Sequence, residues 1–137
     1  MIVHTRRVRF EEVDAARIVF FGHFLAYAHE AMEAFFASLE GGYPRLIMER
    51  GVGLPAVQIE MTFAKPVRYG DVLHIETSTA KLGTRSAVLR YRMKKQPDGE
   101  LVADVSHTVV TTDLAAMRST AMPPDVRAVF EAHLDPG

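Results

Sequence analysis

Apolar and polar positions divide the chain into one helix-like stretch and a series of strand-like runs. Between residues 21 and 39, apolar side chains recur at spacings of three and four, which places them in one stripe along a helix. The stripe consists of Phe21, Phe24, Leu25, Ala28, Met32, Phe35, Phe36 and Leu39. Gly41 and Gly42 predict its end, because glycine accepts the left-handed conformation common after a last turn. The pattern predicts one long helix over residues 23–40, about 27 Å in length from the usual rise per residue.

Four later runs alternate apolar and polar residues with the period of a half-buried β-strand. They cover residues 57–64, 73–79, 87–94 and 101–112. Turn-forming sequences separate them: Tyr69-Gly70-Asp71, Leu82-Gly83-Thr84 and Gln96-Pro97-Asp98-Gly99. Connections this short make neighbouring strands antiparallel. A short strand before the helix and a short helix near the C-terminus complete the predicted order.

An apolar stripe of this length needs a broad apolar surface to pack against, and the predicted sheet supplies one. The expected fold class is α+β, a curved antiparallel sheet of about five strands wrapped around one long central helix. The helix covers only one face of such a sheet, so the other face and the free edges favour self-association. We therefore expect a homo-oligomer, either a dimer or a homotetramer.

Composition and charge narrow the function classes. A chain of 137 residues is expected to form a single domain, residues 1–137. With 16 basic and 17 acidic residues, the net charge is -1, so neither nucleic acid nor a membrane is an expected partner. Cysteine is absent, which excludes disulfides, thiolate metal sites and a cysteine nucleophile. No signal-peptide-like start and no membrane-spanning run are found, so a cytoplasmic location is expected.

The most informative residue is Asp14, between a short strand pattern and the helix. Its neighbours Val13 and Ile18-Val19-Phe20-Phe21 are apolar, so packing is expected to remove the carboxylate partly from water. Such burial costs free energy unless the charge is hydrogen-bonded or paired, and such positions are enriched in functional sites. The alternative is a turn aspartate that hydrogen-bonds its own backbone where a strand ends. The adjacent Glu11 and Glu12 are expected to be mainly solvated.

The element order and the stretch around Asp14 together resemble the hotdog-fold thioesterases, more closely the 4-hydroxybenzoyl-CoA thioesterase-like family. In that family an aspartate ends a strand, and small residues, an apolar triplet, a polar residue and a helix-starting aromatic follow. The matching positions here are Phe10, Asp14, Ala15, Ile18-Val19-Phe20-Phe21, His23 and Phe24. The likeness continues through Glu49-Arg50-Gly51-Val52-Gly53, the strand at 57–63, Tyr69-Gly70-Asp71-Val72-Leu73 and Met122-Pro123, which is nearly the whole chain.

The resemblance implies a hotdog fold and an acyl-CoA thioesterase that acts on an aryl- or short-chain acyl-CoA without a cofactor. By the same resemblance, Asp14 is the catalytic carboxylate, as nucleophile or as general base on water. The oxyanion would be held by the backbone N–H of Phe21, because unpaired amides and the helix dipole favour negative charge at a helix start. Two positions depart from the family, which usually has Gly at Arg17 and Asn at His23. These departures bear on substrate choice more than on reaction type.

Binding residues follow from the same resemblance. The expected substrate contacts are Arg17, His23, Phe24, Tyr27 and His29, with Met48 and Val52 nearby. A purely structural histidine is the alternative interpretation of His29. The phosphates of coenzyme A are expected to bind Arg85, Ser86 and Arg118, because the arginine fork makes paired hydrogen bonds to phosphate. A solvated surface position is the alternative for each arginine.

Three other functions compete with this interpretation. A metal site is not expected, because the H-E-x-x-H pattern is absent and the pair His29 and Glu33 is typical of a helix ion pair or a solvated face. Gly22-His23-Phe24 resembles the start of the hotdog dehydratase motif, but Leu25-Ala26-Tyr27-Ala28 lacks the prolines and glycine that should follow. A non-catalytic acyl-CoA-binding protein would have no need of Asp14. Thiol release from an acyl-CoA distinguishes a thioesterase from both the hydratase and the binder.

Overall fold

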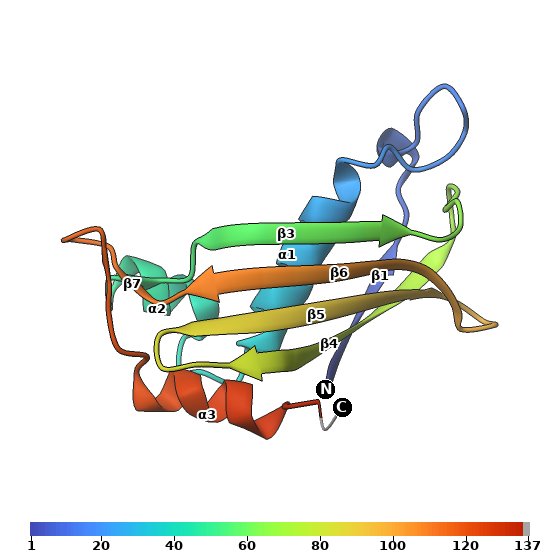
Figure 1. The fold of residues 1–137 in the computed structure, drawn as a ribbon. Coiled ribbons are helices and arrows are strands. Elements are labelled where there is room, and N and C mark those ends of the chain that lie inside the picture. The colour runs from blue at the N-terminus through green and yellow to red at the C-terminus, as the bar shows by residue number, and fades with distance from the viewer. Residues whose placement is uncertain (136–137) are drawn as a thin grey trace.

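The computed structural model describes residues 1–135 and contains one large antiparallel sheet, shown in Figure 1. Its five strands lie in the order β1-β4-β5-β6-β3. Their bounds are Ile2–Arg7 for β1, Val72–Leu82 for β4, Ser86–Lys95 for β5, Glu100–Val110 for β6 and Ala56–Phe63 for β3. The four predicted runs and the short N-terminal strand are therefore confirmed, as is the α+β antiparallel class.

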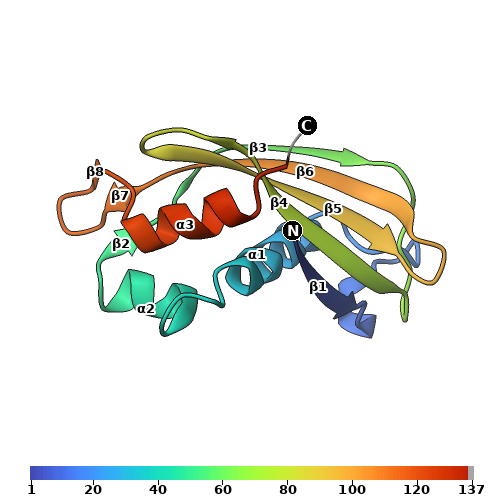
Figure 2. The same cartoon turned by 90° about the horizontal axis from the view of Figure 1, so that it is seen from below.

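The helices lie on one side of this sheet, and the other side is bare (Figure 2). They are α1 (His23–Phe35), α2 (Gly42–Met48) and α3 (Pro124–Ala132). Inward-facing Ile75, Leu89 and Met93 are fully buried beneath α1, whose Phe24 and Phe35 belong to the same core. The bare face is polar and carries cross-strand ion pairs such as Lys94–Glu76 at 2.9 Å and Arg90–Asp104 at 2.7 Å. The polar alternate positions explain why no helix covers that face.

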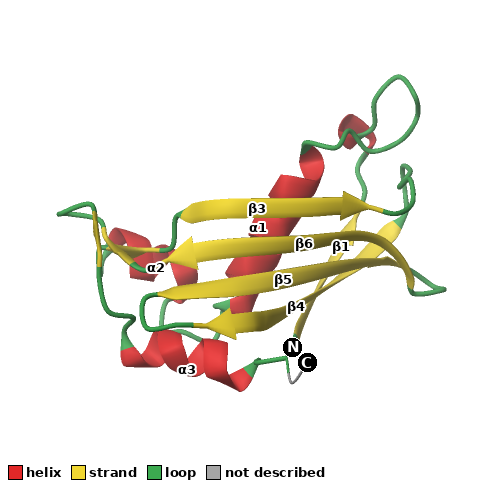
Figure 3. Cartoon of the chain, in the orientation of Figure 1, coloured by secondary structure: helices red, strands yellow, loops and turns green. Residues whose placement is uncertain are grey.

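Several short elements had no strong signal in the sequence. A 3-10 turn η1 (Phe10–Glu12) follows β1, and β2 (Val52–Gly53), β7 (Thr112–Asp113) and β8 (Arg118–Ser119) form a second small sheet. Figure 3 shows this small sheet beyond one end of the large one. None of the helices in the described chain combines the length and the apolar composition that crossing a membrane requires.

The prediction of one helix over residues 23–40 is wrong at its C-terminal end. Helix α1 stops at Phe35, and after a series of turns α2 begins at Gly42, with Gly41 at a φ of 75° before it. The physical reason is tertiary packing, because the ring of Phe36 packs against two other rings. Its centroid lies 5.6 Å from that of Tyr43 and 5.3 Å from that of Phe130. A straight helix could not bury Phe36 and Leu39 in this way. Within the predicted stripe, Phe21 and Leu25 are exposed.

Strand β3 differs from the prediction in its burial. Its alternation predicts a half-buried strand, but the inward side chains of Val57, Ile59 and Phe63 are 60%, 42% and 48% exposed. Two arrangements cause this exposure: β3 is an edge strand, and α1 packs mainly over β1 and β4. An apolar strip along β3 (Val57, Ile59, Met61 and Phe63, called the β3 strip below) is thus left open beside α1.

Candidate active site

Asp14 lies in a tight hairpin loop between Val13 and Val19, which form an antiparallel bridge. The loop is closed by the Asp14 amide, which donates to the Ile18 carbonyl at 2.9 Å, and by the Arg17 amide, which donates to the Asp14 carbonyl at 2.9 Å. Arg17 has a φ of 68°, in the left-handed region that glycine favours. The departure from the family's glycine has therefore kept the turn at the cost of backbone strain.

The carboxylate of Asp14 is exposed in the single chain, so the expectation that its apolar neighbours shield it is wrong. The turn interpretation is confirmed: the Ala16 amide donates to Asp14 Oδ1 at 2.8 Å. The other oxygen, Oδ2, has no hydrogen-bond partner within residues 1–135. The turn fixes one oxygen and leaves the second available to react, so the structural and catalytic interpretations are compatible.

A buried ionic cluster supports the hairpin from beneath and corrects the expectation that Glu12 is solvated. Glu12 is 6% exposed, forms an ion pair with Arg6 and accepts hydrogen bonds from the Tyr27 hydroxyl at 2.9 Å and the Arg9 amide at 2.8 Å. Its main-chain carbonyl accepts the Phe20 amide at 3.0 Å. One residue thereby joins β1, α1 and both arms of the hairpin.

The cluster contains a second carboxylate, that of Glu30. Arg6 Nε donates to Glu30 at 3.0 and 3.1 Å, and His4 lies 3.1 Å from the same group. Burial would raise the pKa of Glu12, but the hydrogen bonds from Arg9 and Tyr27 and the charge of Arg6 hold it below its usual value. Burial and the hydrogen bond to Glu12 raise the pKa of Tyr27. Tyr27 is 0% exposed, so it has no surface to offer a substrate and instead positions the hairpin.

Phe21 lies where the hairpin enters α1. The amides of Phe20, His23 and Phe24 each donate to a backbone carbonyl, whereas the Phe21 amide has no such acceptor within residues 1–135. This free N–H lies at the positive end of the α1 dipole, where an anion is favoured. Phe21 is 66% exposed and its ring packs on Phe20 at 4.5 Å. The predicted oxyanion donor thus has no backbone acceptor in the described chain, and its residue is exposed.

An apolar groove of about 340 Å³ runs beside this turn. Ile18, Phe21 and Phe24 line it from the hairpin and α1, and Phe63 and Pro66 line it from the end of β3. Phe24 packs edge-on against Phe63 at 5.2 Å, and the Val19 amide bonds the Val67 carbonyl at 2.7 Å. The groove therefore joins the Asp14 hairpin to the open β3 strip. Half-buried His23 follows Phe21 at the start of α1.

His29 lies further along α1 on a second cavity, of about 310 Å³. Its side chain is 61% exposed and 3.9 Å from Glu33, the helix pair expected from their spacing. Three polar residues on this cavity, Tyr43, Tyr91 and His107, were not predicted from the sequence. For Tyr91 and His107 the signal was present, because each occupies an inward position in the alternation of its strand.

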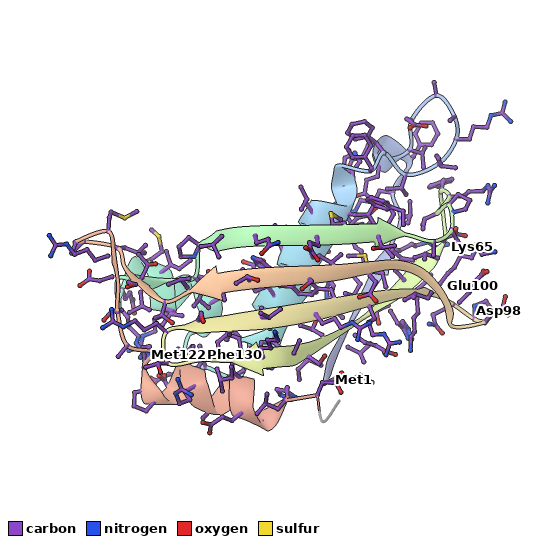
Figure 4. All side chains as sticks on the ribbon, viewed as in Figure 1. Met1, Lys65, Asp98, Glu100, Met122 and Phe130 are labelled. Carbon is purple, nitrogen blue, oxygen red and sulfur yellow. The ribbon has the colours of Figure 1, made fainter. Side chains whose placement is uncertain are left out.

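The expected coenzyme A residues lie at the opposite end of the sheet from Asp14. Arg85 donates to the Ser119 carbonyl and hydroxyl at 3.1 Å, which brings Arg85, Ser86 and Arg118 together. Ser86 pairs with Val110, beyond the Ala56 end of β3, whereas Asp14 lies by the Phe63 end. Figure 4 shows these two ends by the labels Met122 and Lys65. One chain therefore does not bring together the residues predicted for catalysis and those predicted for coenzyme A binding.

Comparison with known proteins gives a consistent class. A family model described as the thioesterase-like superfamily matches residues 8–130. A 1,4-dihydroxy-2-naphthoyl-CoA hydrolase from Synechococcus elongatus is 34% identical over 103 residues, 74% of this chain and 76% of that protein. The hydrolase of the same name from Prochlorococcus marinus is 30% identical over 112 residues, 77% of this chain and 72% of that protein.

Solved structures agree with these relatives. A thioesterase-superfamily protein from Jannaschia sp. CCS1 superimposes with a TM-score of 0.89 at 32% identity, covering 98% of this chain and 93% of the other. A gentisyl-coenzyme A thioesterase does so with a TM-score of 0.83 at 28% identity, covering 94% and 99%. Fold and matches together define a thioester hydrolase with the hotdog fold. The chain belongs to the thioesterase-like superfamily.

Proposed function

We propose that this protein hydrolyses the thioester of an aryl acyl-CoA, with Asp14 as its catalytic carboxylate. The observation that carries the proposal is that two groups of this hairpin region have no hydrogen-bond partner in the described chain: Asp14 Oδ2 in the loop, and the Phe21 amide where the hairpin leads into α1. A carboxylate that can activate water and a donor that can hold the tetrahedral oxyanion are the parts that thioester hydrolysis requires.

The reaction balances with these two groups. Acting as general base, Asp14 accepts a proton from water as the water oxygen bonds to the thioester carbon, and the Phe21 N–H donates to the developing oxyanion. Collapse of this intermediate breaks the carbon–sulfur bond, and the thiolate leaves with the proton held by Asp14. Acting as nucleophile, Asp14 bonds to the thioester carbon, and collapse of the intermediate breaks the carbon–sulfur bond, expels the thiolate and leaves an anhydride. Water then cleaves this anhydride, which regenerates Asp14 and releases the acid, and the proton from water goes to the thiolate. Both routes give the free acid and coenzyme A.

The aryl class is supported by the relatives and by the groove. Relatives at 34% and 30% identity are named for a dihydroxynaphthoyl thioester, and a structural neighbour for a gentisyl thioester. The groove beside Asp14 is lined by Phe21, Phe24 and Phe63, which suit a flat aromatic ring. A short aliphatic acyl group would leave much of this aromatic surface wet.

The protein is further proposed to act as a homo-oligomer built on a dimer that pairs β3 with β3. In the described chain β3 is bonded only to β6, and the β3 strip beside it is apolar and open. An unpaired edge with such a strip is a surface that self-association covers. Antiparallel pairing would bring the Ala56 end of one chain to the Phe63 end of the other, and so bring the partner's Arg85 toward Asp14.

Thiol release from a panel of acyl-CoAs by wild type and Asp14→Asn tests the function. Asparagine keeps an oxygen that can accept the Ala16 amide, so the turn should survive while hydrolysis falls by a factor of about 10³ or more. Equal hydrolysis by both proteins would refute the role of Asp14. Hydration of an enoyl-CoA without thiol release would favour a hydratase, and tight binding without any turnover a binding protein.

A further inference from the structure

The second cavity lies between α1, α2 and the inner face of the sheet. Its walls are mostly apolar side chains of α1, β3 and β6, into which four polar side chains are set: His29, Tyr43, Tyr91 and His107. A mostly apolar pocket with a few placed polar groups is the usual form of a small-molecule site. Its volume of about 310 Å³ is at the lower end of the range for such sites, which suits one small ring system.

Two of the polar groups form a pair. The Tyr91 hydroxyl and His107 Nδ1 are 2.9 Å apart, and Tyr91 is fully buried. Burial, together with the nearby His29, lowers the pKa of His107, and burial raises the pKa of Tyr91. Both side chains are therefore neutral near neutral pH, and the imidazole has one donor nitrogen and one acceptor nitrogen.

The pairing leaves one ring nitrogen of His107 unused. Nδ1 is engaged by Tyr91, whereas Nε2 has no hydrogen-bond partner among residues 1–135. Because the bond to Tyr91 fixes which way the ring faces, Tyr91 also biases the tautomer and hence the role of Nε2. A free polar atom on an apolar cavity wall favours a ligand that brings one matching polar group.

The cavity lies further along the same two elements that line the groove beside the hairpin. Phe24 of α1 and Phe63 of β3 line the groove, whereas Leu25 of α1 and Ile59 of β3 line the cavity. In a β3-paired dimer the cavity also borders the interface. The partner's β3 would run antiparallel there, so the end of that strand nearest the partner's Asp14 would lie beside the cavity. An acyl ring that extends from a thioester beside a hairpin, along α1 and β3, would point toward this space.

We propose that His107 recognises a hydroxyl group on the acyl ring, and that Tyr91 is the positioning residue that orients His107. This assignment rests on the proposed aryl thioesterase function and names a specificity determinant for it. A site that hydrogen-bonds a substrate hydroxyl disfavours the analogue without it, because the site's own polar group is then left unpaired.

The test compares matched substrates within each variant. kcat/KM is measured for benzoyl-CoA and for 2-, 3- and 4-hydroxybenzoyl-CoA, and the ratio of the best hydroxylated substrate to benzoyl-CoA is taken. This ratio does not depend on the fraction of folded enzyme. His107→Leu should lower it about tenfold, the usual contribution of one neutral hydrogen bond. His107→Gln keeps a donor and an acceptor and should retain more of the preference, and Tyr91→Phe should lower the ratio by less than His107→Leu.

Matched controls are available on other surfaces. His74→Leu changes a histidine on the bare face of the sheet, and Tyr69→Phe changes an exposed tyrosine, so neither should move the ratio. The affinities of the Asp14→Asn protein for the same thioesters, with and without His107→Leu, provide a reading that needs no turnover.

The outcomes separate the two proposals. An unchanged substrate ratio and an unchanged affinity ratio in His107→Leu would overturn the role of His107 and leave the hydrolysis intact. Absence of thiol release by wild type, or full release by Asp14→Asn, would instead refute the proposed function, and the affinity ratio would then decide the role of His107 by itself.

Discussion

The Tyr27 hydroxyl donates to Glu12 Oε1 at 2.9 Å, in a cluster from which water is nearly excluded. Glu12 also bonds the backbone at Arg9 through its side chain and the backbone at Phe20 through its carbonyl. Asp14 is two residues beyond Glu12, and Phe21 follows Phe20. The buried carboxylate of Glu12 thus sets where the Asp14 carboxylate and the proposed oxyanion donor, the Phe21 amide, lie relative to each other.

Tyr27→Phe should lower the free energy of unfolding by about 1–3 kcal/mol, because it leaves Glu12 buried with one donor fewer. The ring itself, which packs on Phe24 at 5.7 Å, is retained. Denaturant unfolding measures the change. Tyr69→Phe is the matched control, since Tyr69 is 63% exposed and its hydroxyl has no partner in the described chain. Equal losses in the two variants would argue against the Tyr27–Glu12 bond.

The pH dependence of stability should carry a component from Glu12. Its folded pKa lies below the ordinary value of 4.5, so the folded state binds the proton more weakly than the unfolded state. The resulting stabilisation is fully present above about pH 4.5 and is lost as the pH falls through the folded pKa. The hydrogen bond from Arg50 lowers the pKa of Asp125, so Asp125 contributes to the pH dependence in the same direction.

Glu12→Gln should therefore be less stable than wild type at neutral pH, and its stability should fall less steeply below pH 4.5. Parallel acid titrations would contradict this.

The strands and the hairpin aspartate could be predicted because their signals are local. The alternation of apolar and polar residues and the turn-forming residues each involve positions close in sequence, and the residues around Asp14 form one short motif. The end of α1 could not be predicted, because the contact of Phe36 with Phe130 joins positions far apart in the sequence. The cluster of Arg6, Glu12 and Tyr27 escaped prediction for the same reason, since isolated charges near a turn are typical of a solvated surface.

Arg17→Gly should stabilise the protein by about 1 kcal/mol, because glycine adopts a φ of 68° without the strain of a Cβ atom. Arg17→Ala removes the same charge but keeps the strain, so it should show no such gain. Thermal unfolding of the two variants separates the backbone effect from the side-chain effect. Arg17 is exposed, and a gain of equal size in both variants would place the effect in its charge.

Ile59→Lys tests the proposed pairing of β3 edges, since it puts a charge on the apolar β3 strip. Ile59 is 42% exposed in the single chain, so the substitution should leave the monomer folded while the oligomer dissociates. Sedimentation equilibrium measures the mass. Glu60→Lys, at the next position but on the bare face, is the control. An unchanged mass for Ile59→Lys would exclude the β3 strip as the interface.

Mixing two defective variants tests whether the site is shared between chains. Arg85 and Arg118 lie at the far end of the sheet from Asp14, so they can serve that residue only across an interface. The double variant Arg85→Ala with Arg118→Ala should raise KM roughly tenfold or more, from the loss of charge-assisted bonds to phosphate.

A hybrid dimer of this variant with Asp14→Asn contains one site in which both the Asp14 carboxylate and the two arginines are intact. After subunit exchange of equal amounts, about half of the dimers are hybrids with one intact site of two, so low-substrate activity should recover to about a quarter of wild type. Exchange is followed by a size tag on one variant. Complete exchange without recovery would show that these arginines do not bind coenzyme A for the partner's Asp14.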